Sequence, residues 1–360
     1  MEAKGLFNVA RKEFIDHLTS RGFIIILALF LIISASGMHE GINRYNQQLD
    51  TYKEQISQIK EVEGIEPGYM PEKPSIMLVF MFMSSYIMML GAILAIAMGF
   101  DLLSKEKETR SLKSLLSCPV FRDEIINGKA LGGTLALVFA MGTALLISLA
   151  ILLIFSIVPS MNELAAISVF GIVSIVFLLA YFAIALMMST VSRDSGSALL
   201  YTLVIFFILG SLLPIVGSTV AGMVAGDPPE PPAFDIPYET NESEGHIYKW
   251  EGTNEEMQQY QEELRAYWEK RKTITETFNI ISPNMNYQKI SFLISNPQIY
   301  SAVYEQSSPS SSTYTIQYGE QAPGLLEMLE KVWKNILALI SFSVVFFAIA
   351  YIKFMRMDIR

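Results

Sequence analysis

The sequence contains few residues of the kinds that catalyse reactions or bind metals. Of its 360 residues, one is a cysteine and three are histidines that fall in three separate segments. The lone Cys118 cannot form an internal disulfide, and it excludes a metal site built from cysteines. The HExxH and GxSxG motifs are absent, and the only Gly-Lys pair, Gly128-Lys129, lacks the upstream glycine of a nucleotide-binding loop. We therefore expect this chain to have no catalytic site, no metal and no cofactor of its own.

Charge is scarce as well. Charged residues make up 17% of the chain and hydrophobic residues 52%, and the mean hydropathy is +0.39. This composition excludes a water-soluble globule and a disordered chain. Six stretches have no Asp, Glu, Lys, Arg or His: 22–38, 75–100, 130–162, 164–192, 195–226 and 335–352. Because a helix needs about 20 residues to cross the hydrocarbon core, the runs predict an all-α integral membrane protein with six transmembrane helices.

The predicted organisation alternates six spans with loops on the two sides. The spans are TM1 22–38, TM2 75–100, TM3 130–158, TM4 164–191, TM5 197–225 and TM6 333–352. The loops and ends are a cytoplasmic interfacial helix 1–21, an external helical loop 39–74, a cytoplasmic segment 101–129, a large external loop 226–332 and a cytoplasmic tail 353–360. The two long external segments predict a mainly helical external subdomain.

The distribution of charge indicates the orientation. With the N-terminus placed in the cytoplasm, the inside segments carry 14 Lys and Arg against 10 Asp and Glu, a net charge of +4. The outside segments carry 12 Lys and Arg against 25 Asp and Glu, a net charge of −13. Enrichment of Lys and Arg in the short inside loops follows the positive-inside rule. We expect a multi-pass protein of the cell membrane with both termini in the cytoplasm.

The first apolar run has a second interpretation. Ser34-Ala35-Ser36 resembles the cleavage site of a signal peptide. A signal peptide usually begins with a short basic region, whereas here 21 residues precede the run. In them apolar residues recur at helical spacing: Phe7, Ala10, Phe14 and Leu18. This pattern favours an amphipathic helix in the inner membrane interface followed by a retained first span.

Both long external segments contain apolar residues at helical spacing. The stripes are Ile42, Tyr45, Leu49, Tyr52, Ile56, Ile59 and Val62 in the first, and Met257, Tyr260, Leu264, Tyr267, Arg271, Ile274 and Phe278 in the second. We expect the two helices to pack on each other, either only bracing the loops or handling a substrate or partner. The stretch 280–300 is too polar to span and is expected to lie along the outer membrane interface. Asn241 begins a glycosylation triplet.

The six apolar runs contain no Asp, Glu, Lys, Arg or His, and this counts against a proton- or sodium-coupled carrier. The second span instead has small residues at helix-packing spacing, namely Gly91, Ala95 and Gly99. Packing within the bundle is the simpler interpretation of this stripe, and a dimer or substrate surface is the alternative. An acidic chain of net charge −9 also matches nucleic acid poorly.

The densest inside segment lies between the second and third spans. Leu112, Leu115 and Leu116 form an apolar stripe on a short predicted helix that ends at Pro119. A second helix then leads from Arg122 into the membrane. A charged helix with one apolar stripe suits a groove on a soluble partner. The alternative is that the leucines pack beneath the inner surface of the membrane.

This segment resembles the cytoplasmic coupling region of type-2 ATP-binding-cassette (ABC) permeases. The family pattern runs Glu-Lys-Glu, Gly-Thr-Leu, Leu-Leu, Ser-x-Pro-Val-Ser-Arg, Glu-Ile and Gly-Lys. The matching residues here are Glu106, Leu112, Leu115, Leu116, Ser117, Pro119, Val120, Arg122, Glu124, Ile125, Gly128 and Lys129. Arg110 and Ser111 stand where Gly-Thr is usual, and Phe121 where Ser is usual. The large loop with Ser282-Pro283 and Asn296-Pro297 is most similar to the branch of copper-enzyme-maturation (nitrous oxide reductase) and sodium-extrusion permeases.

The resemblance implies the membrane subunit of an ATP-driven exporter. A separate cytoplasmic ABC ATPase would bind ATP and Mg, and a second permease, identical or a sister chain, would complete a dimer in the lipid bilayer. The residues expected to couple the chain to the ATPase are Glu106, Arg110, Leu112, Leu115, Leu116, Pro119, Arg122 and Lys129. The alternative is a mechanotransmission subunit that transports nothing and passes motion of the ATPase to an external partner.

Overall fold

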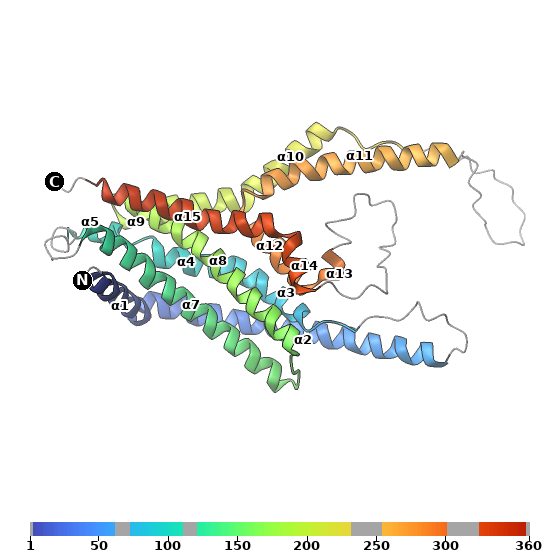
Figure 1. The fold of residues 1–360 in the computed structure, drawn as a ribbon, viewed down its shortest axis with the longest axis horizontal. Coiled ribbons are helices and arrows are strands. Elements are labelled where there is room, and N and C mark those ends of the chain that lie inside the picture. Colours follow the sequence, from blue (N-terminus) through green and yellow to red (C-terminus); the bar gives the residue numbers. More distant parts are fainter. Residues whose placement is uncertain (1–2, 62–72, 111–120, 232–253, 301–323, 358–360) are drawn as a thin grey trace, which may run out of the picture.

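Helices account for every regular element in the parts of the chain that the computed structural model describes, which are residues 3–61, 73–110, 121–231, 254–300 and 324–357. Six are long and apolar enough to cross a membrane: Arg21–Ile59, Met77–Glu108, Arg122–Ile154, Met161–Val191, Ser195–Ala225 and Trp333–Met355. The predicted class, an all-α membrane protein with six spans, is confirmed. The two chain ends lie at the same end of the bundle (Figure 1), which we call the inner end.

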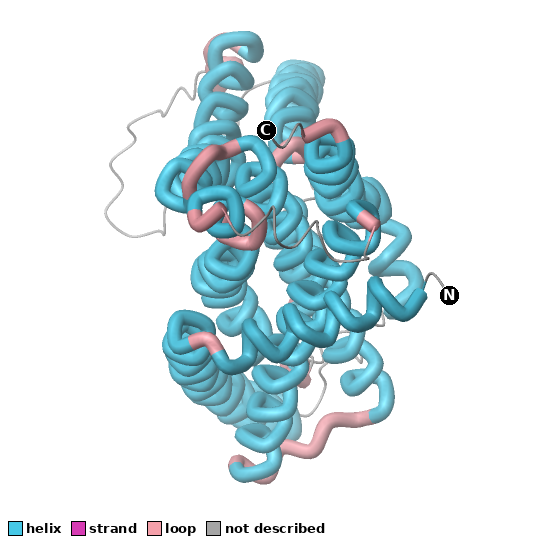
Figure 2. The backbone as a smooth tube through the Cα atoms, turned by 90° about the vertical axis from the view of Figure 1, so that its left-hand side faces the viewer, coloured by secondary structure: helices cyan, strands magenta, loops and turns pink. Residues whose placement is uncertain are grey.

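The first two helices differ in their relation to the bundle. Helix α1 (Ala3–Thr19) crosses the inner end of the bundle, as the view from that end shows (Figure 2). Helix α2 (Arg21–Glu61) forms the first span and continues without a break beyond the opposite, outer end (Figure 1). At 1.5 Å per residue, its 41 residues extend roughly 60 Å, about twice the thickness of the hydrocarbon core.

The fourth span forms the centre of the bundle. The second span consists of α3 (Met77–Tyr86), the π-helix η1 (Ile87–Gly91) and α4 (Ala92–Gly99), followed by the short α5 (Ser104–Glu108). The third is α7 (Arg122–Ile154) and the fourth α8 (Met161–Val191). Helix α8 packs against α4, α7, α12 and α15, and its Phe170, Phe177 and Tyr181 are completely buried. Ser160 and Glu163 cap its start reciprocally.

The fifth span changes from α-helix to π-helix midway along its length. It runs through α9 (Ser195–Phe207), the π-helix η2 (Ile208–Leu212) and α10 (Leu213–Ala225), which ends at Gly226 with a φ of 79°. Pro214 has no N–H to donate to the carbonyl of Gly210, four residues earlier. The wider π-turn is located at this missing hydrogen bond. The sixth span is α15 (Trp333–Met355).

The two external helices do not pack on each other as the sequence predicts. Helix α11 (Asn254–Asn279) lies along α10, whereas the outer part of α2 follows α3 (Figure 1). Gly217 explains the first pairing, because a Cβ there would lie 2.5 Å from the Cβ of Phe278. Gly41 explains the second, because a Cβ there would lie 2.7 Å from the carbonyl oxygen of Val79. The part of each stripe nearest the bundle therefore packs against a neighbouring span.

The expectation that residues 280–300 lie along the membrane interface is also wrong. Helix α12 (Pro283–Ser295) packs inside the outer end of the bundle against α3, α8 and α15, and the short α13 (Pro297–Tyr300) and α14 (Leu325–Lys331) follow. Its polar groups find partners there: the Tyr181 hydroxyl donates to Asn284 Oδ1 at 2.6 Å, and Asn335 Nδ2 donates to Asn286 Oδ1 at 2.7 Å. Satisfied hydrogen bonds allow this polar helix to be buried.

Candidate functional site

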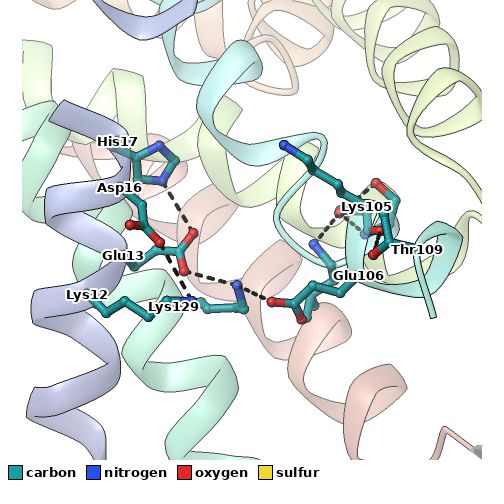
Figure 3. A network of polar contacts seen from close by, with 11 residues as sticks. Lys12, Glu13, Asp16, His17, Lys105, Glu106, Thr109 and Lys129 are labelled. Atoms are coloured by element: carbon teal, nitrogen blue, oxygen red, sulfur yellow. Dashed lines mark hydrogen bonds and ion pairs between the residues drawn. The ribbon is translucent and has the colours of Figure 1, made fainter. Parts of the chain in front are cut away.

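Three charged side chains meet at the inner end of the bundle, where α1, α5 and α7 come together (Figure 3). Lys129 Nζ lies 3.0 Å from Glu13 Oε2 and 2.9 Å from Glu106 Oε1. The side chains of Lys129, Glu13 and Glu106 are only 5%, 11% and 18% exposed. We call Glu13, Lys129 and Glu106 the inner triad. One ammonium group thus joins three separate segments of the chain.

Two glycines of α7 bring α1 close enough for the triad to form. A Cβ on Gly128 would lie 2.7 Å from Val9 Cβ, and one on Gly132 would lie 2.7 Å from the carbonyl oxygen of Ala10. Glycines four residues apart lie on one face of a helix and let a second helix approach closely. Helix α1 packs on this face, and Glu13 is thereby placed beside Lys129.

His17 lies next to the triad on α1. Its Nε2 is 3.9 Å from Glu13 Oε1 (Figure 3). Burial lowers the pKa of His17 below its usual value of 6.5, although the neighbouring Glu13 and Asp101 oppose that shift. The imidazole is therefore neutral at pH 7, and it adds no positive charge to the triad.

A second lysine fastens the other side of α5 to the end of the fourth span. Lys107 Nζ donates to the carbonyl oxygens of Ser189, Thr190 and Ser192 at 2.9, 2.6 and 2.9 Å. These oxygens belong to the C-terminal end of α8, where helical carbonyls lack partners and the helix dipole favours a cation. The Ser189 hydroxyl in turn accepts the backbone N–H groups of residues 103 and 104, each at 2.9 Å. These hydrogen bonds hold α5 against the end of α8.

The start of α7 is fastened to the C-terminal end of the sixth span. Arg122 Nη1 donates to the carbonyl oxygen of Met357 at 3.0 Å. Glu124 Oε2 accepts the backbone N–H of Phe121 at 3.1 Å and caps α7. Both flanks of residues 111–120 are consequently held by α1, α7, α8 and α15.

The predicted coupling residues fall into three groups. Glu106, Lys129 and Arg122 contact other parts of this chain. Arg110 is exposed, and its φ of 57° lies in the left-handed region that favours glycine. Leu112, Leu115, Leu116 and Pro119 lie outside the described residues.

A cavity of about 480 Å³ opens beside the triad. Its lining combines apolar residues, including Phe23 of α2 and Leu94 of α4, with charged residues, including Asp16, Asp101 and Lys105. A cavity with both apolar and charged residues in its lining can admit an amphipathic solute. Within the described ranges, no three His, Cys, Asp or Glu side chains gather to hold a metal ion.

The predicted packing stripe of the second span faces α8. A Cβ on Gly91 would lie 2.8 Å from Leu178 Cδ2, and one on Gly99 would lie 2.7 Å from Ala185 Cβ. Ala95 between them is fully buried. Sequence reasoning missed Glu13, Gly132 and Lys107. The Gly128-x-x-x-Gly132 spacing signals a helix contact, whereas no sequence pattern pairs Glu13 with a lysine 116 residues away.

Comparison with known proteins identifies one matching family. A family model described as "ABC-2 family transporter protein" matches residues 7–359. No curated protein matches the sequence.

Proposed function

Because the chain belongs to the ABC-2 transporter family and is a permease subunit of an ABC transporter, we propose that it couples ATP hydrolysis by a separate ATPase subunit to export across the membrane. The ATPase binds ATP and Mg at the inner end of the bundle. Both termini of the permease are then cytoplasmic, as the charge distribution indicates. A second permease, identical or a sister chain, completes the transporter.

The attachment of the segment 101–129 is the observation that carries this proposal. Its first flank is fixed to α8 by Lys107 and to α1 and α7 by the inner triad. Its second flank is fixed to α15 by Arg122. A displacement of residues 111–120 by a partner is therefore transmitted to four helices at once. Such rigid-body motion of packed helices is a known route from a local push to a change of access.

We assign the predicted coupling residues to different roles. Glu106, Lys129 and Arg122 act as positioning residues that hold the ends of the segment. Leu112, Leu115 and Leu116 on the predicted helix bind the groove of the ATPase, and Pro119 ends that helix. Arg110 is exposed at the start of the segment, where its side chain is available to a partner.

Export requires the outer end of the bundle to open. Helix α12 fills this end and is held by hydrogen bonds from Tyr181 and Asn335. We infer that motion of α8 and α15, which carry these two residues, displaces α12 when access changes. The cavity beside the triad is the corresponding opening on the inner side, and its mixed lining favours an amphipathic cargo.

One observation favours the mechanotransmission alternative. Helix α2 is a single uninterrupted rod that begins beside the inner end and projects beyond the outer end. A proline at the exposed position Gln48 would break this rod outside the bundle. If the chain only transmits motion, Gln48→Pro abolishes the effect on the external partner while ATPase coupling persists. If the chain is an exporter, ATP-dependent transport persists in that variant.

The direct test is affinity purification of the tagged chain from its own membranes, with measurement of co-purifying proteins and ATPase activity. The Leu115→Asp, Leu116→Asp variant should lose the ATPase subunit. Leu326→Asp is the matched control, because that side chain is 82% exposed on α14 at the opposite end of the bundle. Absence of any ATPase from the wild-type sample, or equal recovery with the double variant, would refute the proposal.

A further inference from the structure

A basic pocket lies at the outer end of the bundle, where the end of α11 meets the starts of α12 and α15. The cavity has a volume of about 320 Å³. Four cationic residues and one carboxylate, Glu276, are among the residues that line it. The cations are Arg271, Lys272, Lys289 and Lys334. We call this cavity the outer basic pocket.

The charge of the pocket is opposite to that of its surroundings. The segments assigned to the outside carry 12 Lys and Arg against 25 Asp and Glu. Four of those 12 basic residues line this single cavity. In an acidic outer region, such a gathering makes the pocket a local site of positive potential that attracts anions.

Much of this positive charge is not neutralised by neighbouring carboxylates. Lys289 Nζ pairs with Glu276 Oε1 at 2.9 Å. Arg271 and Lys334 form no ion pair with any carboxylate in the described parts of the chain. Arg271 Cζ instead lies 5.4 Å from the centre of the Trp268 ring, and Lys334 Nζ lies 5.9 Å from that of the Trp333 ring. Stacking on an aromatic face leaves a cation's charge available to an anionic ligand.

Two buried polar atoms of the pocket also lack partners. Trp268 Nε1 and Asn279 Oδ1 have no hydrogen-bond partner within the described structure. Both residues line the cavity. The indole N–H can only donate a hydrogen bond, whereas the Asn279 amide oxygen can only accept one. Buried polar groups normally have a partner, so the unpaired indole N–H of Trp268 points to a ligand that accepts hydrogen bonds.

We propose that the outer basic pocket binds the phosphate group of an anionic ligand. Arg271 and Lys334 supply the charge, and Trp268 supplies a neutral donor beside an apolar ring. An anionic phospholipid of the outer leaflet is one source of such a group, because Trp333 and Lys334 begin the sixth span at the level where aromatic and basic residues meet headgroups. A free phosphate-bearing solute is the other. The site is separate from ATPase coupling, and only its assignment to the outer leaflet rests on the proposed orientation.

Binding is tested with the full chain in nanodiscs of three kinds. These contain phosphatidylcholine alone, phosphatidylcholine with phosphatidylglycerol, or phosphatidylcholine alone with added inorganic phosphate. Tryptophan fluorescence reports occupancy because Trp268 lines the pocket, and native mass spectrometry counts retained lipid. The Arg271→Gln, Lys334→Gln variant should bind the anion at least tenfold more weakly than the wild type.

A matched control removes the same charge from α11 outside the pocket. Arg265 and Lys270 are exposed and do not line the cavity, so Arg265→Gln, Lys270→Gln should bind as the wild type does. If the pocket double variant melts early, the single variants Lys334→Gln and Arg271→Lys replace it, and only Lys334→Gln should weaken binding.

The outcomes separate the two sources of phosphate. Retention of phosphatidylglycerol without any response to inorganic phosphate in phosphatidylcholine discs identifies a lipid headgroup site. A saturable response to inorganic phosphate in phosphatidylcholine discs identifies a site for a free anion. Equal binding by the wild type and the pocket variant, or no response of the wild type to either anion, would overturn the proposal. No ATPase takes part in these measurements, so their failure leaves the proposed function standing.

Discussion

Replacing Lys129 by methionine removes the only positive charge of the inner triad while keeping a long unbranched side chain. The two carboxylates of Glu13 and Glu106 then remain near the position of the lost ammonium group, from which they lay 3.0 and 2.9 Å away. Neither is well hydrated, since their side chains are 11% and 18% exposed. The variant therefore tests whether the triad holds α1, α5 and α7 together.

The size of the effect follows from the geometry. Two unit charges at the observed separation of 3.0 Å attract each other by about 5 kcal/mol at an effective dielectric constant of 20. Desolvation offsets much of this attraction, but removing one partner of a buried pair still costs roughly 3–5 kcal/mol, because the remaining charge is left without compensation. We expect Lys129→Met to lower the melting temperature of the purified chain by about 5 °C or more.

A compensating variant separates loss of charge balance from loss of packing. The triple variant Glu13→Gln, Glu106→Gln, Lys129→Met leaves no buried charge without a partner. Its free energy of unfolding should therefore return to within about 2 kcal/mol of the wild-type value. Thermal unfolding in detergent, followed by tryptophan fluorescence, measures both variants. The reasoning is wrong if Lys129→Met melts within 1 °C of the wild type, or if the triple variant melts as early as the single one.

Three further predictions concern the same end of the bundle. Gly132→Ala should destabilise the chain by about 1–3 kcal/mol, because its Cβ would lie 2.7 Å from a backbone oxygen of α1. The control Gly142→Ala, whose Cβ would have no atom within 4 Å, should be neutral or slightly stabilising in the same melting assay. Because φ of residue 110 is 57°, Arg110→Gly should raise the free energy of unfolding by up to about 1 kcal/mol, and Arg110→Val should lower it. Equal melting temperatures of the two variants would argue against an effect of the backbone conformation. Because burial holds the pKa of His17 below 6.5, the unfolded chain binds a proton that the folded chain excludes. Stability should therefore fall as pH falls from about 6.5 through the lowered pKa and stay level above 6.5, and His17→Asn should remove this dependence from melting curves recorded across that range.

The six spans could be predicted because each is an uninterrupted apolar run, and the lipid environment alone requires such runs. The inner triad could not be predicted, because Glu13 and Lys129 are brought together by the contact of α1 with two glycines of α7. The small residues themselves are visible in the sequence. Which helix fills the space beside them is decided only by the packing of the whole bundle.

The burial of α12 was missed for a related reason. Asn284 and Asn286 make the stretch appear suited to a membrane surface. Inside the bundle, however, they are hydrogen-bonded by Tyr181 and Asn335, which lie 103 and 49 residues away in the sequence. A polar residue is excluded from a core only when it lacks partners there. Sequence periodicity does not reveal such partners. The burial of α12 could therefore be recognised only from the structure.

The single cysteine of the chain provides the most direct test of the central claim, that residues 111–120 receive a cytoplasmic ATPase. Cys118 lies within this stretch and needs no engineering. A membrane-impermeant maleimide is applied to inside-out and right-side-out vesicles, with and without the ATPase subunit. We predict that Cys118 reacts only in inside-out vesicles and that the ATPase slows the reaction. Labelling from the outside, or a rate that the ATPase leaves unchanged, would contradict the proposed function.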